Sequence, residues 1–298
     1  MIDMAERRRR LLNSMPYDKS VVIRYLMLDL SLSNRNGTDL FLKETAGTSL
    51  SPDIQAAINA TLSWHNSKVI HVGESGTLLR FLKYYDWYTR SNKEFVLSGT
   101  LQHRTISNDR EKILKMPLKK LLTLDNQTSQ WASAAYLFRP TKPNLPSNAP
   151  FKLLVTKRAY DDYTNEIFKY NRWVAPVDST IYYQAMAALN ASVSNTTVVC
   201  CYARHSEDYC FARVFNRATV EEGRTRFPSL VNHESNRLVE VDTAKQHFVN
   251  TGVIDSNDHR IVQALVMYAK INRLQFTCVN STCVTKSWPK FWEFAELL

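Results

Sequence analysis

The chain has 298 residues, with 38 Lys and Arg against 28 Asp and Glu, which gives a formal net charge of +10. Hydrophobic residues make up 44% and charged residues 22%, as in ordinary globular proteins. Only 7 glycines occur, where average usage gives about 20, and neither G-x-G-x-x-G nor G-x-x-x-x-G-K-[ST] is present. Collagen-like chains and the two common Gly-rich phosphate loops are therefore excluded, and the positive charge predicts an anionic partner.

Short β-like runs alternate with amphipathic helical stretches along the chain, a pattern typical of the α/β or α+β class. Residues 139–150 hold four of the ten prolines and are expected to form an exposed loop. The expected helices cover residues 21–32, 52–64, 77–88, 131–138, 181–189, 210–220 and 261–271. The expected strands cover residues 68–71, 95–97, 151–156 and 197–202.

The sequence contains neither an apolar run long enough to span a membrane nor a signal peptide, so the cytoplasm is the expected location. Five cysteines predict reduced thiols, and their spacing does not suggest a metal site. The arginine run Arg7–Arg10 is interpreted as a solvated helix face. A nucleic-acid arm is the alternative, but no RNP or zinc-finger motif accompanies it, so no nucleic-acid partner is expected.

Small polar residues repeatedly precede the apolar helical runs, as Ser75 and Asp258 do. Taken singly, such residues are typical helix caps. Capping does not call for a cation, however, and Lys19, Arg80 and Arg260 lie within about one turn of these starts, where the helix dipole disfavours positive charge. The combination predicts anions bound at several helix N-termini.

Six motifs follow one another along the chain: Lys19-Ser20-x-x-x-Arg24, Gly73–Arg80, Thr128-Ser129-Gln130, Glu234–Leu238, Asp258-His259-Arg260 and Lys286–Phe291. In this order they resemble the 5-enolpyruvylshikimate-3-phosphate synthase family, and the resemblance extends over residues 17–296. Lys-Ser at the first motif favours this family over the related UDP-N-acetylglucosamine enolpyruvyl transferases.

This resemblance implies an α/β (α+β) fold of two domains, each an inside-out barrel of βαβαββ repeats, here with repeats shortened or missing. The domains are expected at residues 19–187 and at residues 1–18 plus 188–298, with the active site in the cleft between them. The implied reaction transfers the enolpyruvyl group of phosphoenolpyruvate to the 5-hydroxyl of shikimate 3-phosphate and releases phosphate. A monomer that needs neither cofactor nor metal is expected.

The resemblance also implies the site residues. Asp208, Glu234 and Lys19 are the expected proton-transfer groups, because the addition needs a base at the 5-hydroxyl and an acid at the methylene carbon. The expected phosphoenolpyruvate contacts are Lys19, Gly76, Arg104, Gln130, Arg237, Arg260 and Lys286. The expected shikimate 3-phosphate contacts are Ser20, Arg24, Thr128, Ser129, Gln130, Tyr160, Asp208 and His233.

Three positions depart from the family pattern. Glu74 replaces the usual Asn near the phosphate, His233 replaces a Lys, and Arg104 is displaced from the usual Arg position. Asp208 also has a second interpretation, as a helix cap. The alternative function is therefore a catalytically impaired descendant that binds anionic metabolites or a protein partner.

Overall fold

The computed structural model describes residues 4–32, 36–170, 176–199, 201–232 and 236–298. The chain divides into a central unit, residues 17–176, and a terminal unit, residues 1–16 together with 177–298. The expected boundary after residue 187 falls inside the helix Ser179–Val193, which belongs entirely to the terminal unit. That boundary was therefore placed about ten residues too late.

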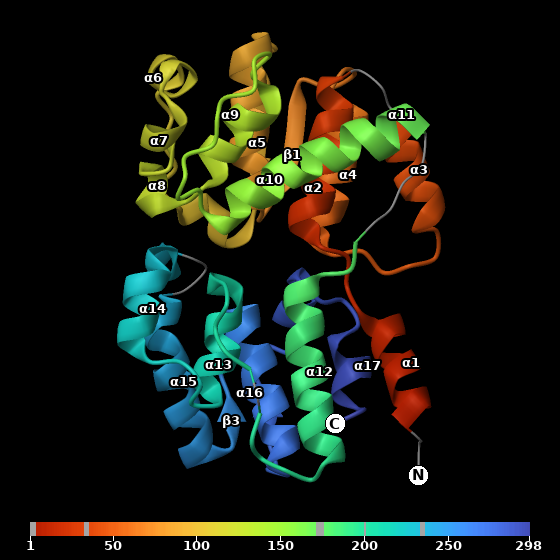
Figure 1. The fold of residues 1–298 in the computed structure, drawn as a ribbon, viewed down its shortest axis with the longest axis vertical. Helices are drawn as coiled ribbons and strands as arrows, with labels where there is room; N and C mark the ends of the chain where they lie inside the picture. Colours follow the sequence, from red (N-terminus) through yellow and green to blue (C-terminus); the bar gives the residue numbers. More distant parts are fainter. Residues whose placement is uncertain (1–3, 33–35, 171–175, 200, 233–235) are drawn as a thin grey trace. The chain divides into compact units, whose positions relative to one another are not determined.

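The central unit is mostly helical, and its long helices α2, α4, α5 and α9 run alongside one another (Figure 1). Helix α10 crosses this group obliquely and packs on α2 and α9. Its elements are α2 (Lys19–Ser31), α3 (Asn36–Glu44), α4 (Pro52–Ser63), β1 (Val69–Gly73), α5 (Gly76–Thr89), β2 (Glu94–Leu97), η1 (Gly99–His103), α6 (Arg110–Lys115), α7 (Leu118–Leu121), α8 (Leu124–Gln127), α9 (Gln130–Phe138), α10 (Phe151–Asp162), the π-helical turn η2 (Tyr163–Ile167) and α11 (Phe168–Tyr170).

The terminal unit is also mostly helical, and α16 lies at its centre, packed against α12, α13, α15 and α17. The N-terminal helix α1 packs on α17. Its elements are α1 (Met4–Ser14), α12 (Ser179–Val193), η3 (Ser206–Asp208), α13 (Tyr209–Val214), α14 (Val220–Arg226), η4 (Pro228–Asn232), α15 (Arg237–Thr251), β3 (Val253–Ile254), α16 (His259–Ile271), β4 (Thr277–Cys278), η5 (Cys283–Lys286) and α17 (Phe291–Ala295).

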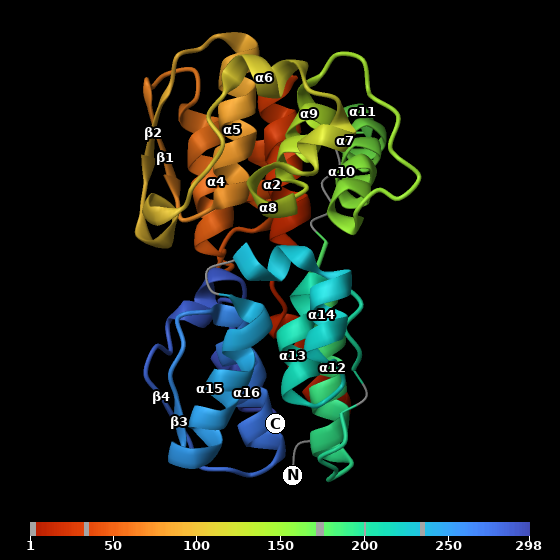
Figure 2. The same cartoon turned by 90° about the vertical axis from the view of Figure 1, so that its left-hand side faces the viewer.

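Each unit contains one two-stranded parallel sheet whose strands are joined through a helix. In the central unit Val69 lies opposite Glu94, and in the terminal unit Val253 lies opposite Thr277. The same succession of helix, strand, helix and strand, α4-β1-α5-β2 and α15-β3-α16-β4, therefore occurs once in each unit (Figure 2). Among the described residues these are the only sheets, so the fold is mixed α and β with helices dominant.

Two expected strands are wrong. Residues 151–156 form the start of α10, because Leu153, Thr156, Ala159 and Tyr163 are all buried at helical spacing over a longer stretch than the six residues that suggested a strand. In the described part of 197–202, Val199 and Cys201 are buried, but no strand is formed and no described strand pairs with this segment.

Each unit has its own hydrophobic core. Trp131 lies at the centre of the central core and stacks on Trp87 with ring centroids 5.5 Å apart. Trp288 is buried in the terminal core and donates from Nε1 to the carbonyl oxygen of Ser14. No helix in the described ranges has the length and apolar character that crossing a membrane requires.

Candidate anion-binding site

The first turns of three central-unit helices, α2, α4 and α10, are joined by side-chain hydrogen bonds. Lys19 at the start of α2 lies 2.8 Å from Asp53 Oδ2 in the first turn of α4. The Ser20 hydroxyl accepts from Lys152 Nζ, in the first turn of α10, at 3.1 Å. Because these contacts connect residues far apart in the sequence, the polar starts of α2, α4 and α10 lie together at one end of the unit.

Arg24 is buried at this end, with 2% of its surface exposed. Its Nε donates to Thr156 Oγ1 and its Nη1 to the Ser20 carbonyl oxygen, both at 2.6 Å. Longer contacts of 3.4 Å join its Nη2 to Ser133 Oγ and to the Lys152 carbonyl oxygen. These four acceptors are neutral oxygens from α2, α9 and α10, so Arg24 connects the three helices.

A second cation, Arg80, connects the starts of α5 and α9. Its Nη1 donates to Gln130 Oε1 at 2.7 Å and to the Gly76 carbonyl oxygen, while its Nε pairs with Asp125 Oδ2 at 2.6 Å. Asp125 also accepts from Ser107 and from Trp131 Nε1. Burial opposes ionisation of Asp125, but the attraction of Arg80 and these hydrogen bonds outweigh it and hold the pKa of the carboxyl below its ordinary value.

Gly76 leaves room for two guanidinium groups at the start of α5. A Cβ atom at residue 76 would lie 3.0 Å from Arg80 Nη1 and 3.6 Å from Arg104 Nη1. The charge of Arg104 contributes, after burial, to a lowered pKa of Arg80. The structure thus brings Gly76, Arg104 and Gln130, three expected phosphoenolpyruvate contacts, around Arg80.

Side chains cap some helix starts and leave others open. Asp18, Ser51 and Ser75 accept backbone N–H bonds at the starts of α2, α4 and α5. Within the described residues, no side chain caps α9 or α10, although Ser129 occupies the N-cap position of α9. The Thr128 hydroxyl contacts the Gln130 N–H at 3.4 Å. The N-cap residues of α9 and α10, Ser129 and Pro150, thus make no side-chain capping bond in the described structure.

The terminal unit carries a corresponding cluster at the starts of α15 and α16. Arg237 Nε pairs with Asp258 Oδ2 at 2.7 Å, and the Arg237 side chain is 4% exposed. Asp258 Oδ1 caps α16 by accepting from the Arg260 and Ile261 N–H groups. Arg260 is buried, its Nη2 lies 4.0 Å from Asp178, and its Nη1 has no hydrogen-bond partner among the described atoms. A buried guanidinium with an open N–H group is a favourable anion contact.

Lys286 lies close to this cluster. Lys286 is the last residue of η5. Gln263 Nε2, on α16, donates to the Val284 carbonyl oxygen in η5 and to the hydroxyl of Ser287, which follows Lys286. Since Gln263 lies one turn after Arg260 on α16, the structure places Arg237, Arg260 and Lys286 at the same end of the terminal unit.

Asp208 serves as a cap in the structure. It is fully buried and accepts from the backbone N–H groups of Arg204 and His205 and from Gln184 Nε2. Burial raises the pKa of its carboxyl against the effect of these hydrogen bonds. Glu234 and His233, the other expected acidic and substrate-contact residues, lie outside the described residues.

The structure does not bring Tyr160 to Ser20 and Arg24. Tyr160 follows Lys152 by eight residues on α10, about 12 Å along the helix axis. Its ring packs instead edge-on to Tyr136 and beneath Lys142 Nζ, which is 4.4 Å from the ring centroid.

Sequence reasoning missed Asp53, Asp125 and Lys152. Asp53 follows Pro52 in the first turn of α4, so the helix-start pattern could have included it. Lys152 follows Pro150 by two residues, and proline before an apolar run is also a helix-start signal. Asp125 carried no signal, because three of its four donors come from Arg80 and Ser107, which are 45 and 18 residues away.

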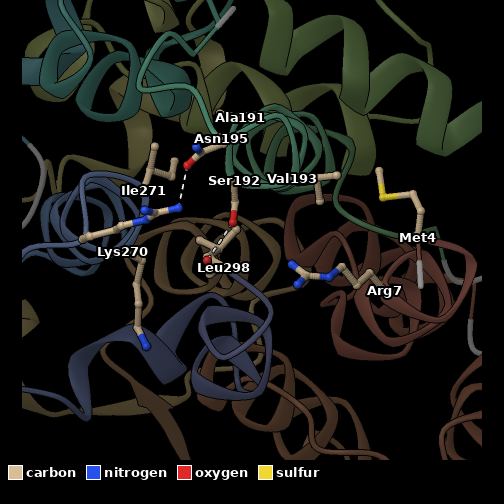
Figure 3. A pocket seen from close by; sticks show the side chains of 10 residues that line it. Met4, Arg7, Ala191, Ser192, Val193, Asn195, Lys270, Ile271 and Leu298 are labelled. Atoms are coloured by element: carbon tan, nitrogen blue, oxygen red, sulfur yellow. Dashed lines mark hydrogen bonds between the residues drawn. The ribbon is translucent and has the colours of Figure 1, made fainter. Parts of the chain in front are cut away.

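A pocket lies elsewhere in the terminal unit. It measures about 320 Å³ and is lined by Met4, Arg7, Ala191, Ser192, Val193, Asn195, Lys270, Ile271, Arg273 and Leu298 (Figure 3). Lys270 is ten residues beyond Arg260 on α16, about 15 Å along its axis. None of the expected site residues lines this pocket. Lys270 and Arg273 lie at the C-terminal end of α16, where cations complement the helix dipole, whereas Arg7 lies near the start of α1.

No family model, curated protein or solved structure matches this chain. The functional argument therefore depends on the residues, their spacing and their geometry.

Proposed function

We propose that the chain is a 3-phosphoshikimate 1-carboxyvinyltransferase, which transfers the enolpyruvyl group of phosphoenolpyruvate to the 5-hydroxyl of shikimate 3-phosphate. The observation that carries the proposal is the meeting of motif residues from distant parts of the central unit. Ser20 and Arg24 meet α9 and α10, while Gly76, Arg104 and Gln130 surround Arg80. Three of the six ordered motifs contribute to this one end of the unit.

The charges suit the two proposed substrates. Phosphoenolpyruvate and shikimate 3-phosphate each carry one phosphate and one carboxylate. Guanidinium groups bind such oxygens in pairs, and uncapped helix N-termini add backbone donors. In the proposal, the cluster around Arg24 and Arg80 in the central unit binds part of this negative charge. The Arg237–Arg260–Lys286 cluster of the terminal unit binds another part.

The proposed reaction proceeds by addition and elimination. A base takes the proton of the 5-hydroxyl, the oxygen bonds to C2 of phosphoenolpyruvate, and an acid protonates the methylene carbon C3. The C2–O bond to phosphate then breaks, C3 returns a proton, and inorganic phosphate leaves. Lys19, Asp208 and Glu234 are the proposed proton-transfer groups, and the surrounding cations stabilise the developing charge.

The proposed fold is a reduced form of the two-domain inside-out barrel. The single α-β-α-β succession in each unit supports this, as a remnant of longer βαβαββ repeats. A cytoplasmic monomer without cofactor or metal remains a prediction, as does an active-site cleft between the units.

One observation favours the alternative, an impaired descendant that binds anionic metabolites without turnover. Asp208 is fully buried and its carboxylate is already used as a cap. Phosphate release after mixing the protein with both substrates separates the two functions. Release that requires both substrates supports the transferase, whereas binding of shikimate 3-phosphate by calorimetry without any release supports the alternative.

A further inference from the structure

The pocket at the end of α16 carries positive charge from three side chains. Arg7 comes from α1, whereas Lys270 and Arg273 come from the end of α16 and the turn that follows it. Among the described residues that line the pocket, none is Asp or Glu. The carboxyl ends of α12 and α16 offset about half a charge each, and a carboxylate at Leu298 would offset one more, so the pocket remains positive.

The two guanidinium groups of the pocket are held by neutral acceptors. Arg7 Nη1 donates to the Leu297 carbonyl oxygen at 2.6 Å, and Arg273 Nη2 donates to Asn195 Oδ1 at 2.5 Å. Because a guanidinium has five N–H donors, each arginine retains donors that a ligand can use. Figure 3 shows the Lys270 side chain extending away from Asn195, so the two arginines are the cations that face the polar lining.

A hydroxyl group and apolar side chains complete the lining. The Ser192 hydroxyl, in the last turn of α12, donates to the Leu298 oxygen at 2.6 Å. Met4, Val193 and Ile271 add apolar surface, and Val193 is 45% exposed. The volume of about 320 Å³ lies at the small end of ligand pockets, which measure about 300–1,000 Å³. Cationic donors beside apolar side chains suit a small organic anion better than a bare inorganic ion.

We infer that this pocket binds a small organic phosphate, with the phosphate on Arg7 and Arg273 and the apolar part against Val193 and Ile271. A phosphate monoester carries up to two negative charges on three terminal oxygens, so it can accept from more than one guanidinium group. The inference is independent of the proposed transferase, because the proposed substrate contacts of the terminal unit lie toward the opposite end of α16.

Calorimetry with phenyl phosphate, phenol and inorganic phosphate tests this inference. Phenol lacks the phosphate, and inorganic phosphate lacks the apolar ring. The variants are Arg7→Gln and Arg273→Gln. Arg9→Gln is the matched control, because Arg9 also lies on α1 but is outside the pocket and pairs with Glu6. Arg260→Met removes a cation from the other anion cluster of the unit. Melting temperatures show whether each variant folds, and the exposed Arg273 provides the test if Arg7→Gln unfolds.

We expect each pocket variant to bind phenyl phosphate about tenfold more weakly than the wild type, because a hydrogen bond to a charged group is lost. The wild type should bind phenyl phosphate about tenfold more tightly than inorganic phosphate, since the ring buries apolar surface. Arg9→Gln should bind as the wild type, and the affinity that depends on Arg7 and Arg273 should persist in Arg260→Met.

Four results overturn the inference. They are a wild type that does not bind phenyl phosphate, a wild type that binds phenyl phosphate no better than phenol or inorganic phosphate, unchanged affinity in both pocket variants, and a loss confined to Arg260→Met. Each of them leaves the proposed transferase standing, because the pocket shares no residue with the proposed substrate contacts.

Discussion

Replacing Asp125 by Asn removes the carboxylate that the described structure pairs with Arg80, with little change in shape. Asp125 has a φ of 48°, in the left-handed region that Asn also tolerates, so the substitution adds little backbone strain. The Asp125 and Arg80 side chains are 5% and 9% exposed, and their closest atoms are 2.6 Å apart. The variant therefore tests the loss of the buried negative charge and not a change of backbone conformation at residue 125.

The expected loss is large, because removing one partner of a buried ion pair leaves an uncompensated charge. Such losses are about 3–5 kcal/mol. The amide group also presents N–H donors where one carboxylate oxygen accepted from Arg80 and Trp131. Gln130 and the Gly76 carbonyl oxygen still accept from Arg80 and reduce the loss, so we expect about 3 kcal/mol, or roughly 6–12 °C in melting temperature.

Thermal unfolding followed by tryptophan fluorescence measures this loss, since Trp131 contacts Asp125 directly. Asp161→Asn is the control and should cost less than about 0.5 kcal/mol, because its pair with Lys157 is exposed. The pKa of Asp125 is lowered from 3.8. Its stabilising contribution is therefore present above pH 3.8 and disappears as the pH falls through the lower, folded-state pKa, so the wild type and Asp125→Asn should converge in acid. A melting temperature at neutral pH equal to that of the wild type refutes the reasoning.

Three further predictions separate binding from stability. Ser129→Ala should leave the unfolding free energy unchanged and weaken shikimate 3-phosphate binding in calorimetry. Ser75→Ala removes a helix cap and should lower the unfolding free energy in urea by about 0.5–1 kcal/mol. A destabilised Ser129→Ala would contradict the absence of a capping bond from Ser129. Lys19→Met should abolish phosphate release. Because this substitution leaves the buried Asp53 carboxylate without its cation, it should also lower stability by about 1–3 kcal/mol. Retained release would remove Lys19 from the mechanism. Arg260→Met should eliminate phosphoenolpyruvate binding in calorimetry, and unchanged affinity would show that its open Nη1 does not serve this ligand.

The helix starts were the most predictable part of the structure. Ser75 and Asp258 cap helices where local sequence alone indicated a helix start. A cap is a local interaction within three residues, so the sequence contains nearly all the information that decides it. The helices 52–64 and 261–271 were predicted almost to the residue for the same reason.

The interactions between distant segments were not predictable. Residues 151–156 resemble a strand when they are taken alone, and only the buried face that extends to Tyr163 makes them a helix. This error hid Lys152 and Thr156, because a strand would not have placed either of them beside Arg24. The Asp125 carboxylate was missed because its partners, Arg80 and Ser107, are 45 and 18 residues away.

The central claim is tested most directly by phosphorus NMR of the protein mixed with phosphoenolpyruvate and shikimate 3-phosphate, with enzyme and substrates at comparable concentrations. The proposed transferase predicts that the phosphoenolpyruvate signal is replaced by inorganic phosphate, and that the shikimate 3-phosphate signal shifts to that of its enolpyruvyl ether. Both changes should require both substrates and be absent with Lys19→Met. Unchanged spectra with folded wild-type protein would contradict enolpyruvyl transfer.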